Sequence, residues 1–232
     1  MNTYDWIFFD ADNTLFDFDR AEHDALELVL VDLGAAYDES YFEVYQQINK
    51  ACWRAFENGE LPKNQLRTIR FERFFAHYGL VADPGDVSRK YLQKLSESAH
   101  LLEGADDLLL RLSNDYRLAL VTNGLKEVQR PRFARSGIEH YFELIVVSDE
   151  IGVAKPERGF FDYVFRQIGG PRPDRVLIVG DNLNSDIRGG IQYGIDTCWY
   201  NPNGFRGEIT VRPTYTIQKL EELPSILLNG KN

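Results

Sequence analysis

Four short polar segments of this chain each come after an apolar run, and two of them carry pairs of carboxylates. Asp10 and Asp12 follow one such run, and Asp181 and Asp186 follow another. Carboxylates that are brought together repel one another unless a proton or a cation lies between them. Oxygen ligands of this kind suit Mg²⁺, which proteins commonly share with phosphate groups. The pattern therefore indicates a magnesium-assisted reaction on a phosphorylated molecule.

The other two polar segments suit the same chemistry. Thr122-Asn123-Gly124 would hold phosphoryl oxygens through a hydroxyl and two backbone amides, and glycine lets the backbone approach closely. Lys155, which precedes a proline, would oppose the negative charge of the phosphoryl group. Each of these residues has a plain alternative, because threonine is common after strands and such a lysine is usually solvated. The four segments together favour a phosphoryl-transfer site.

The apolar runs themselves predict the scaffold. They are short, continuous and rich in β-branched or aromatic residues, which is typical of parallel strands buried on both faces. They lie at residues 6–9, 118–121, 144–147, 176–179 and 197–200. Segments of helical length, 128–136 and 156–168, separate some of them. The sequence therefore predicts an α/β fold, a Rossmann-like open parallel sheet flanked by helices, with its site at the carboxyl ends of the strands.

One long segment, residues 17–102, interrupts this alternation. Its apolar residues recur every three or four positions, and glycine and proline divide it into about four helices. At about 85 residues it is too long for a crossover between parallel strands, which needs a dozen or more. We therefore predict an inserted all-helical subdomain at 17–102, and an α/β core made of residues 1–16 and 103–232.

Composition excludes several other classes of protein. The 232 residues carry 26 Lys+Arg against 36 Asp+Glu, a net charge of −10, which argues against binding a nucleic-acid polymer. Cys52 and Cys198 lie far apart without a Cys/His cluster, which argues against a disulfide framework or a thiolate zinc site. A basic leader and a long apolar run are both missing, so we expect no membrane association and a cytoplasmic location.

The polar segments resemble the motifs of the haloacid dehalogenase (HAD) superfamily of phosphatases. The matching motifs are Phe9-Asp10-x-Asp12-x-Thr14, Thr122-Asn123-Gly124, Lys155-Pro156 and Gly180-Asp181-x4-Asp186. The helical insertion is similar to the cap subdomain of that superfamily. Within it, the chain looks most like the pyrimidine 5′-nucleotidase branch. That likeness rests on Asp17-Phe18 after the first motif and on the segments Trp53-Arg54-x-Phe56-Glu57-x-Gly59-Glu60 and Arg70-Phe71.

The resemblance implies a role for each acidic residue. Asp10 would be the nucleophile, forming an aspartyl-phosphate that divides one difficult displacement into two easier ones. Asp12 would act as general acid and then as general base, which is worth about 10²–10⁴ in rate. Mg²⁺ would be held by Asp10, Asp181 and the backbone carbonyl of Asp12. Asp186 would either bind the ion directly or hold a group that does.

Aromatic and basic residues of the first loop and the insertion are candidates for contact with a nucleoside. They are Phe16, Trp53, Arg54 and Arg70. Stacking of a base on an aromatic ring contributes on the order of 1–3 kcal/mol. Aromatic residues at helical spacing are also typical of a helical core, so packing is the alternative for these positions.

The function we predict is Mg²⁺-dependent hydrolysis of a small phosphate monoester, most simply a pyrimidine nucleoside 5′-monophosphate. Alternatives with the same motifs are a sugar-phosphate or phosphoglycolate phosphatase and a phosphomutase of the β-phosphoglucomutase type. A catalytically silent binding protein on the same fold is a further alternative. A haloacid dehalogenase is disfavoured, because that reaction has no use for a carboxylate at Asp12. The sequence does not identify a protein partner.

Overall fold

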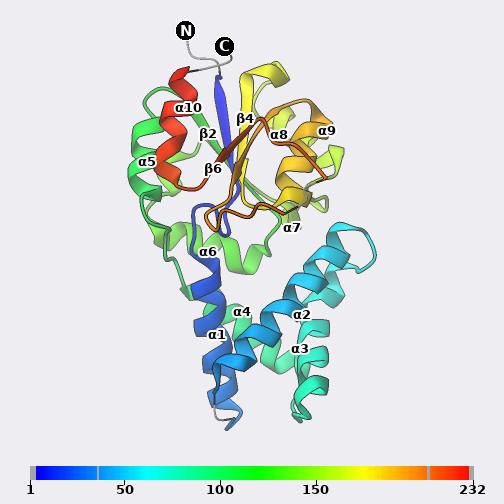
Figure 1. The fold of residues 1–232 in the computed structure, drawn as a ribbon. Helices are drawn as coiled ribbons and strands as arrows, with labels where there is room; N and C mark the ends of the chain where they lie inside the picture. The colour runs from blue at the N-terminus through cyan, green and yellow to red at the C-terminus, as the bar shows by residue number, and fades with distance from the viewer. Residues whose placement is uncertain (1–3, 36, 208–209, 230–232) are drawn as a thin grey trace. The chain divides into compact units, whose positions relative to one another are not determined.

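The chain is described here by a computed structural model that covers residues 4–35, 37–207 and 210–229 (Figure 1). It divides into two compact units, one formed by Met1–Phe18 with Ala99–Asn232 and the other by Asp19–Ser98. The sequence analysis put the limits of the helical insertion at residues 17 and 102. We describe each unit by itself.

The first unit contains a parallel sheet. In the described residues it has six strands in the order β3-β2-β1-β4-β5-β6, and every neighbouring pair is parallel. Their bounds are β1 Trp6–Phe9, β2 Arg117–Thr122, β3 Leu144–Val147, β4 Val176–Gly180, β5 Asp196–Tyr200 and β6 Tyr215–Ile217. The predicted fold class and all five predicted strands are confirmed. The edge strand β6 was not predicted, because three residues are too few to form a recognisable apolar run.

The order of the strands brings the polar segments together. β1 lies between β2 and β4, and Phe9 is in register with Leu120 on one side and Val179 on the other. The chain segments that leave these three strands therefore start at one edge of the sheet. The connection from β1 leads to β2 on one side, while β4 lies on the other, which is the switch point where such folds bind ligands.

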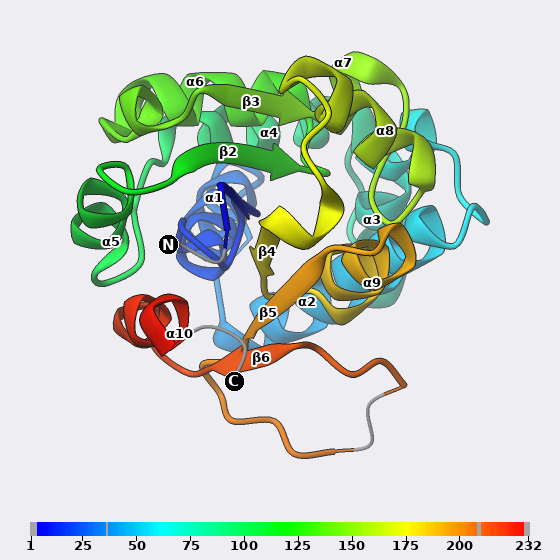
Figure 2. The same ribbon diagram turned by 90° about the horizontal axis from the view of Figure 1, so that it is seen from above.

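Alternate residues of the strands fill two cores, one on each face of the sheet. Ile7 and Phe9 point to the face covered by α5 and α10, and Trp6 and Phe8 point to the face covered by α8 (Figure 2). Strands buried on both faces explain why the predicted runs are continuously apolar. The helices of this unit are α5 Ala105–Leu112, α6 Lys126–Ser136, α7 Ser148–Ile151, α8 Arg158–Gln167, α9 Arg188–Tyr193 and α10 Leu223–Asn229.

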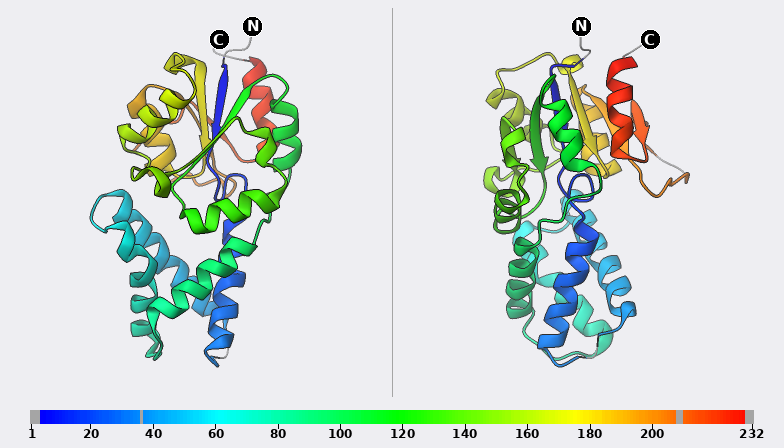
Figure 3. Two further views of the ribbon diagram at one scale, coloured as in Figure 1. Left: turned by 180° about the vertical axis from the view of Figure 1, so that it is seen from behind. Right: turned by 90° about the vertical axis from the view of Figure 1, so that its left-hand side faces the viewer.

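The second unit is helical throughout its described residues, as predicted. It comprises α1 Phe18–Asp32, which begins at the end of the first unit, α2 Glu39–Glu57, α3 Lys63–Tyr78 and α4 Pro84–Glu97. The side chains of Asp38 and Asp83 cap α2 and α4 by accepting backbone N–H groups, and Gly79 ends α3 in a left-handed conformation. α3 packs against both α2 and α4 (Figure 3). Among the described residues, none of the helices in either unit is long and apolar enough to cross a membrane.

Candidate active site

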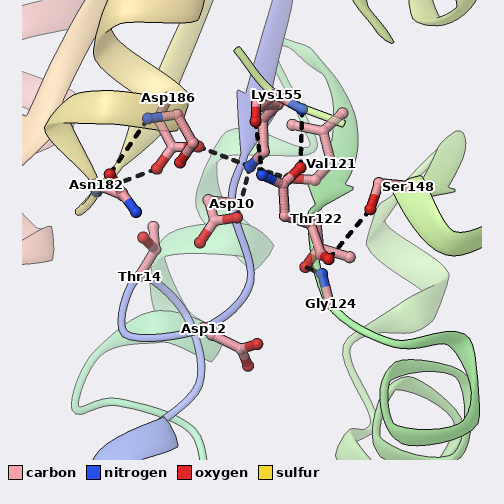
Figure 4. A network of polar contacts seen from close by, with 12 residues as sticks. Asp10, Asp12, Thr14, Val121, Thr122, Gly124, Ser148, Lys155, Asn182 and Asp186 are labelled. Carbon is pink, nitrogen blue, oxygen red and sulfur yellow. Dashed lines mark hydrogen bonds and ion pairs between the residues drawn. The ribbon is translucent and has the colours of Figure 1, made fainter. Parts of the chain in front are cut away.

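Lys155 lies at the centre of the polar segments. Its Nζ donates to Asp10 Oδ1 at 2.6 Å, to Asp186 Oδ1 at 2.6 Å and to the Val121 carbonyl at 2.7 Å (Figure 4). The side chain is fully buried, so the alternative of a solvated lysine is wrong. All three donors of the ammonium group are used, and the two carboxylates raise the pKa of Lys155 above its usual range. The lysine is therefore a fixed positive charge at the end of the sheet.

Asn123 holds the backbone of Lys155 in place. Its side-chain amide donates to the Lys155 carbonyl at 2.8 Å and accepts from the Lys155 N–H at 2.9 Å. The Ser148 hydroxyl donates to the Asn123 carbonyl at 3.1 Å. The sequence analysis considered only the backbone amide of Asn123. Its side chain joins the loop after β2 to the segment that carries Lys155.

Two carboxylates bind this lysine, and a third lies beside them. Asp10, Asp181 and Asp186 each offer an oxygen, and these oxygens lie within 4.8 Å of one another. Burial raises the pKa of Asp10 to about 7, against the opposing effect of Lys155. Burial and the nearby carboxylates also raise the pKa of Asp181 well above its usual range. One ammonium cannot balance three carboxylates, and an all-oxygen donor set is what Mg²⁺ prefers, so these residues fit a divalent cation.

Asp12 lies outside this group. Its carboxylate points away from Asp10 and from Lys155 (Figure 4) and is bound by two side chains of α6. Gln129 Nε2 donates to Asp12 Oδ2 at 2.6 Å, and Arg132 Nη1 donates to Asp12 Oδ1 at 2.5 Å. The sequence analysis missed both partners. Gln129 and Arg132 are three residues apart and so lie on one face of a helix. Because both side chains are polar, the sequence alone predicts that this face is exposed to solvent.

The phosphate-binding candidates lie beside the acidic residues. Thr122 is buried at the end of β2, and its hydroxyl oxygen accepts the Gly124 N–H at 3.0 Å. Gly124 must be glycine for a reason the sequence did not reveal, since a Cβ there would lie 2.3 Å from Gln129 Nε2. Thr14 accepts the Asp181 N–H at 3.1 Å and so ties the loop after β1 to the loop after β4.

The four candidates for substrate contact lie in different surroundings. Phe16 is buried in the first unit and packs against Phe133. Arg70 is buried within the second unit, where its Nη1 donates to an asparagine side chain at 3.1 Å. These two side chains serve internal packing, so the packing alternative fits them better than substrate contact. Trp53 is half-buried and Arg54 is exposed, and both lie on α2, so they stay candidates.

Comparison with known proteins gives close relatives over almost the whole chain. The chain is 38% identical to the pyrimidine 5′-nucleotidase YjjG of Escherichia coli, covering 97% of this chain and 98% of that protein. It is 37% identical to the pyrimidine 5′-nucleotidase PynA of Streptococcus pneumoniae, covering 95% and 93%. A magnesium-bound crystal structure of YfnB from Bacillus subtilis matches it with a TM-score of 0.92, at 38% identity over 97% of this chain and 98% of that one.

The family model for haloacid dehalogenase-like hydrolases matches residues 4–194. This match spans the first polar segment, the helical unit and the other three polar segments. Together with relatives of this identity and coverage, it leaves no ambiguity about ancestry: the chain belongs to the haloacid dehalogenase-like hydrolase family.

Proposed function

We propose that this protein is a Mg²⁺-dependent phosphatase that hydrolyses pyrimidine nucleoside 5′-monophosphates through an aspartyl-phosphate on Asp10. The observation that carries the proposal is the group of three clustered carboxylates at the carboxyl ends of β1 and β4, of which Asp10 and Asp186 are buried and bound to Lys155 and Asp181 is half-buried. The choice of a pyrimidine nucleotide rests on the two relatives that bear that name. We propose that the molecule it binds is a small phosphorylated metabolite. We propose the cytoplasm as its location.

The three clustered carboxylates, with the backbone carbonyl of Asp12, would hold the metal ion. When bound, Mg²⁺ supplies positive charge that lets an anionic nucleophile approach an anionic phosphate. Lys155 also offsets this negative charge, and it does so from a fixed position because its three N–H donors are already engaged. The hydroxyl of Thr122 and the backbone N–H of Asn123 would bind the phosphoryl oxygens, while the Gly124 N–H, which donates to Thr122 Oγ1 at 3.0 Å, would orient that hydroxyl.

In the first half of the reaction, a carboxylate oxygen of Asp10 attacks phosphorus and the bond from phosphorus to the ester oxygen breaks. Oδ1 of Asp10 accepts from Lys155, while in the described part of the chain no hydrogen bond engages Oδ2. We therefore assign the attack to Oδ2. Asp12 gives a proton to the departing ester oxygen, so the nucleoside leaves as an alcohol.

In the second half, water attacks the phosphorus of the aspartyl-phosphate and gives a proton to Asp12. The bond from phosphorus to Asp10 breaks, which releases inorganic phosphate and restores both aspartates to their starting forms. We propose that the helical unit, within residues 17–102, acts as a cap that limits access of water. Trp53 and Arg54 are the residues we propose for contact with the base.

A phosphate-release screen with Mg²⁺ tests this proposal. The panel contains UMP, dUMP and dTMP, the corresponding purine nucleotides, several hexose phosphates and phosphoglycolate, with Asp10→Asn as the inactive control. We expect the pyrimidine nucleotides to have the highest kcat/KM. A preference for a hexose phosphate or phosphoglycolate would overturn the substrate, and transfer of the phosphoryl group to a sugar phosphate would indicate a phosphomutase. Absence of hydrolysis across the panel by folded protein would favour a binding protein.

A further inference from the structure

Two buried side chains of α6 grip the carboxylate of Asp12. Gln129 and Arg132 are 1% and 0% exposed, and each gives one N–H to a different oxygen of Asp12. The Asp12 side chain itself is 27% exposed, so it remains open to solvent on its other side. Two donors on two oxygens fix both the position and the plane of a carboxylate, which a single hydrogen bond does not.

The side chains of Arg132 and Gln129 are themselves held in place by packing. The guanidinium of Arg132 lies over the rings of Phe16 and Phe18, at 4.7 and 5.7 Å from their centroids. Those two residues belong to the same segment as Asp12, so α6 and this segment hold each other. On the other side, the side chain of Gln129 occupies the space that a Cβ at Gly124 would need. Rotamers that are fixed by packing are what an oriented catalytic group requires.

The direction in which Asp12 is held suits its proposed task. In an in-line displacement the leaving oxygen departs on the side of phosphorus opposite the attacking oxygen of Asp10. A proton donor for that oxygen must therefore lie beyond the substrate and not beside Lys155. The Asp12 carboxylate is turned toward α6 and away from the Lys155 network (Figure 4), which agrees with this expectation.

We propose that Gln129 and Arg132 are positioning residues for Asp12, which orient its carboxylate for proton transfer to the leaving group. The inference rests on the proposed function, because it assumes that Asp12 is the acid. Both residues would act through the Asp12 carboxylate, to which they donate, and not on the substrate. Their effect is confined to steps in which Asp12 moves a proton, and this distinguishes positioning from a general role in the fold.

The experiment compares leaving groups. UMP has a poor alcohol leaving group that needs a proton, whereas p-nitrophenyl phosphate releases a stable phenolate that does not. The quantity is kcat/KM, because it ends with release of the leaving group and excludes the later hydrolysis of the aspartyl-phosphate. The variants are Arg132→Met, Arg132→Lys and Gln129→Leu, with Asp12→Asn as the reference. Arg130→Met is the matched control, since Arg130 lies on the same helix and binds Glu150 at 2.7 Å.

We expect Arg132→Met to lower kcat/KM for UMP by about 10²-fold and for p-nitrophenyl phosphate by less than about fivefold. Arg132→Lys recovers part of the loss, Gln129→Leu shows the same selectivity on a smaller scale, and Arg130→Met changes neither substrate. In the Asp12→Asn background, Arg132→Met has no further effect. Equal losses for both substrates in folded Arg132→Lys and Gln129→Leu, or no loss, would overturn the inference. If Asp12→Asn itself lacks the selectivity, then the proposed function fails instead.

Discussion

Both units of this protein bury a cation against a carboxylate, but the balance of charge differs between them. In the α/β unit, Lys155 is bonded to Asp10 and Asp186, and a third carboxylate lies nearby. In the helical unit, Glu22 and Arg70 are buried together, one charge against one. When all the carboxyl groups are ionised, the first group carries an excess of negative charge, whereas the second is neutral without any ligand.

The helical group ties together all four helices of its unit. Glu22 Oε1, on α1, accepts from Asn49 Nδ2 of α2 at 2.5 Å and from the Tyr91 hydroxyl of α4 at 3.3 Å. Arg70, on α3, donates to Asn49 Oδ1 at 3.1 Å, and its guanidinium lies 4.8 Å from the ring centroid of Tyr91. Every partner comes from the same unit. This network holds helices to one another, and it needs no ligand to do so.

A structural ionic network and a ligand-binding site differ in whether their own residues balance the charge. A network within a helical core can balance its own charges, because the neighbouring helices contribute both the cation and the carboxylate, although Nε and Nη2 of Arg70 are buried here without a hydrogen-bond partner. Carboxylates that follow parallel strands converge at one edge of the sheet whether or not their charges balance. There the excess charge of Asp10, Asp181 and Asp186 is left for a cation to offset. The carboxylates of the α/β unit therefore require Mg²⁺, whereas the buried charges of the helical unit do not.

The largest expected effect is on turnover. Asp10→Asn should lower kcat by about 10⁴-fold or more, since an amide cannot form the acyl-phosphate. Phosphate release from UMP measures the loss, and the melting temperature shows whether the fold is kept. Asp5→Asn is a suitable control, because Asp5 precedes the same strand but binds Arg175 at the surface. Turnover by Asp10→Asn close to that of the wild type would exclude the covalent mechanism.

The second effect concerns stability and its response to magnesium. Lys155→Met leaves Asp10 and Asp186 buried without their cation and should cost about 3–5 kcal/mol of unfolding free energy. Mg²⁺ at a hundred times its dissociation constant adds about 2.7 kcal/mol to any variant that keeps the site, and Lys155→Met should gain more than the wild type does, because the ion takes over the charge that Lys155 balances. Arg70→Met in the helical unit also destabilises, but it leaves the magnesium site intact, so Mg²⁺ should stabilise it only as much as the wild type and leave its loss relative to the wild type unchanged. Urea denaturation with and without Mg²⁺ measures both.

Equal recovery of the two variants would remove the contrast between the units. It would mean that Mg²⁺ does not take over the charge that Lys155 balances, since both variants would gain only the increment that binding adds to any variant with an intact site. No recovery of Lys155→Met, combined with no Mg²⁺ stabilisation of the wild type, would contradict the assignment of the clustered carboxylates as ligands.

Most strands of the α/β unit, and the polar residues that follow them, can be predicted from the sequence for a physical reason. Strands buried on both faces must be continuously apolar, so the residue at which the chain turns polar marks the end of the strand. Asp10, Thr122 and Asp181 were found in this way, and the structure brings them to one edge. Lys155 follows its strand by a longer segment, which contains α7, and it was predicted from its place before Pro156 as one of the four polar segments.

The contacts between elements were not predictable. Glu22 lies three, four and seven residues from Ala25, Leu26 and Val29, so its position on the buried face of α1 can be read from the spacing. Its partners on three other helices cannot be read, because spacing within a helix carries no information about the helix opposite. The same limit hid Gln129 and Arg132, whose polar character suggests a solvated face.

The third effect is on the pH dependence of stability in the helical unit. Burial raises the pKa of Glu22 from 4.5 to about 7, so the folded state holds this proton more tightly than the unfolded state does. The contribution of protonated Glu22 to the free energy of unfolding is therefore complete below pH 4.5. It declines between pH 4.5 and about 7 and is lost above that. Glu22→Gln removes the decline and should gain on the order of 3 kcal/mol over the wild type as pH rises through this window.

Hydrogen exchange of the α2 amides at several pH values measures the stability of the helical unit separately from that of the sheet. The groups that face Glu22 and influence it are Asp19, Asn49, Arg70 and Tyr91. Glu27→Gln is the matched control, because Glu27 lies on the exposed side of the same helix, and this substitution should leave the pH dependence unchanged. An unchanged pH profile in Glu22→Gln would show that Glu22 is ionised in the folded protein and paired with Arg70.

The smallest effect is on the affinity for magnesium at different pH values. Burial raises the pKa of Asp10 to about 7, and that of Asp181 is raised as well, so below pH 7 protons compete with the cation for these oxygens. The affinity for Mg²⁺ should fall as pH decreases from 8 to 6, by up to about tenfold for each pH unit and each proton displaced. Calorimetric titration at pH 8, 7 and 6, in buffers of different ionisation enthalpy, gives both the affinity and the number of protons released. Binding that is independent of pH and releases no proton would mean that the carboxylates are already ionised without the metal. In that case the carboxylates would hold their full excess of negative charge between pH 6 and 8, and the competition between protons and Mg²⁺ inferred from the raised pKa values would be wrong.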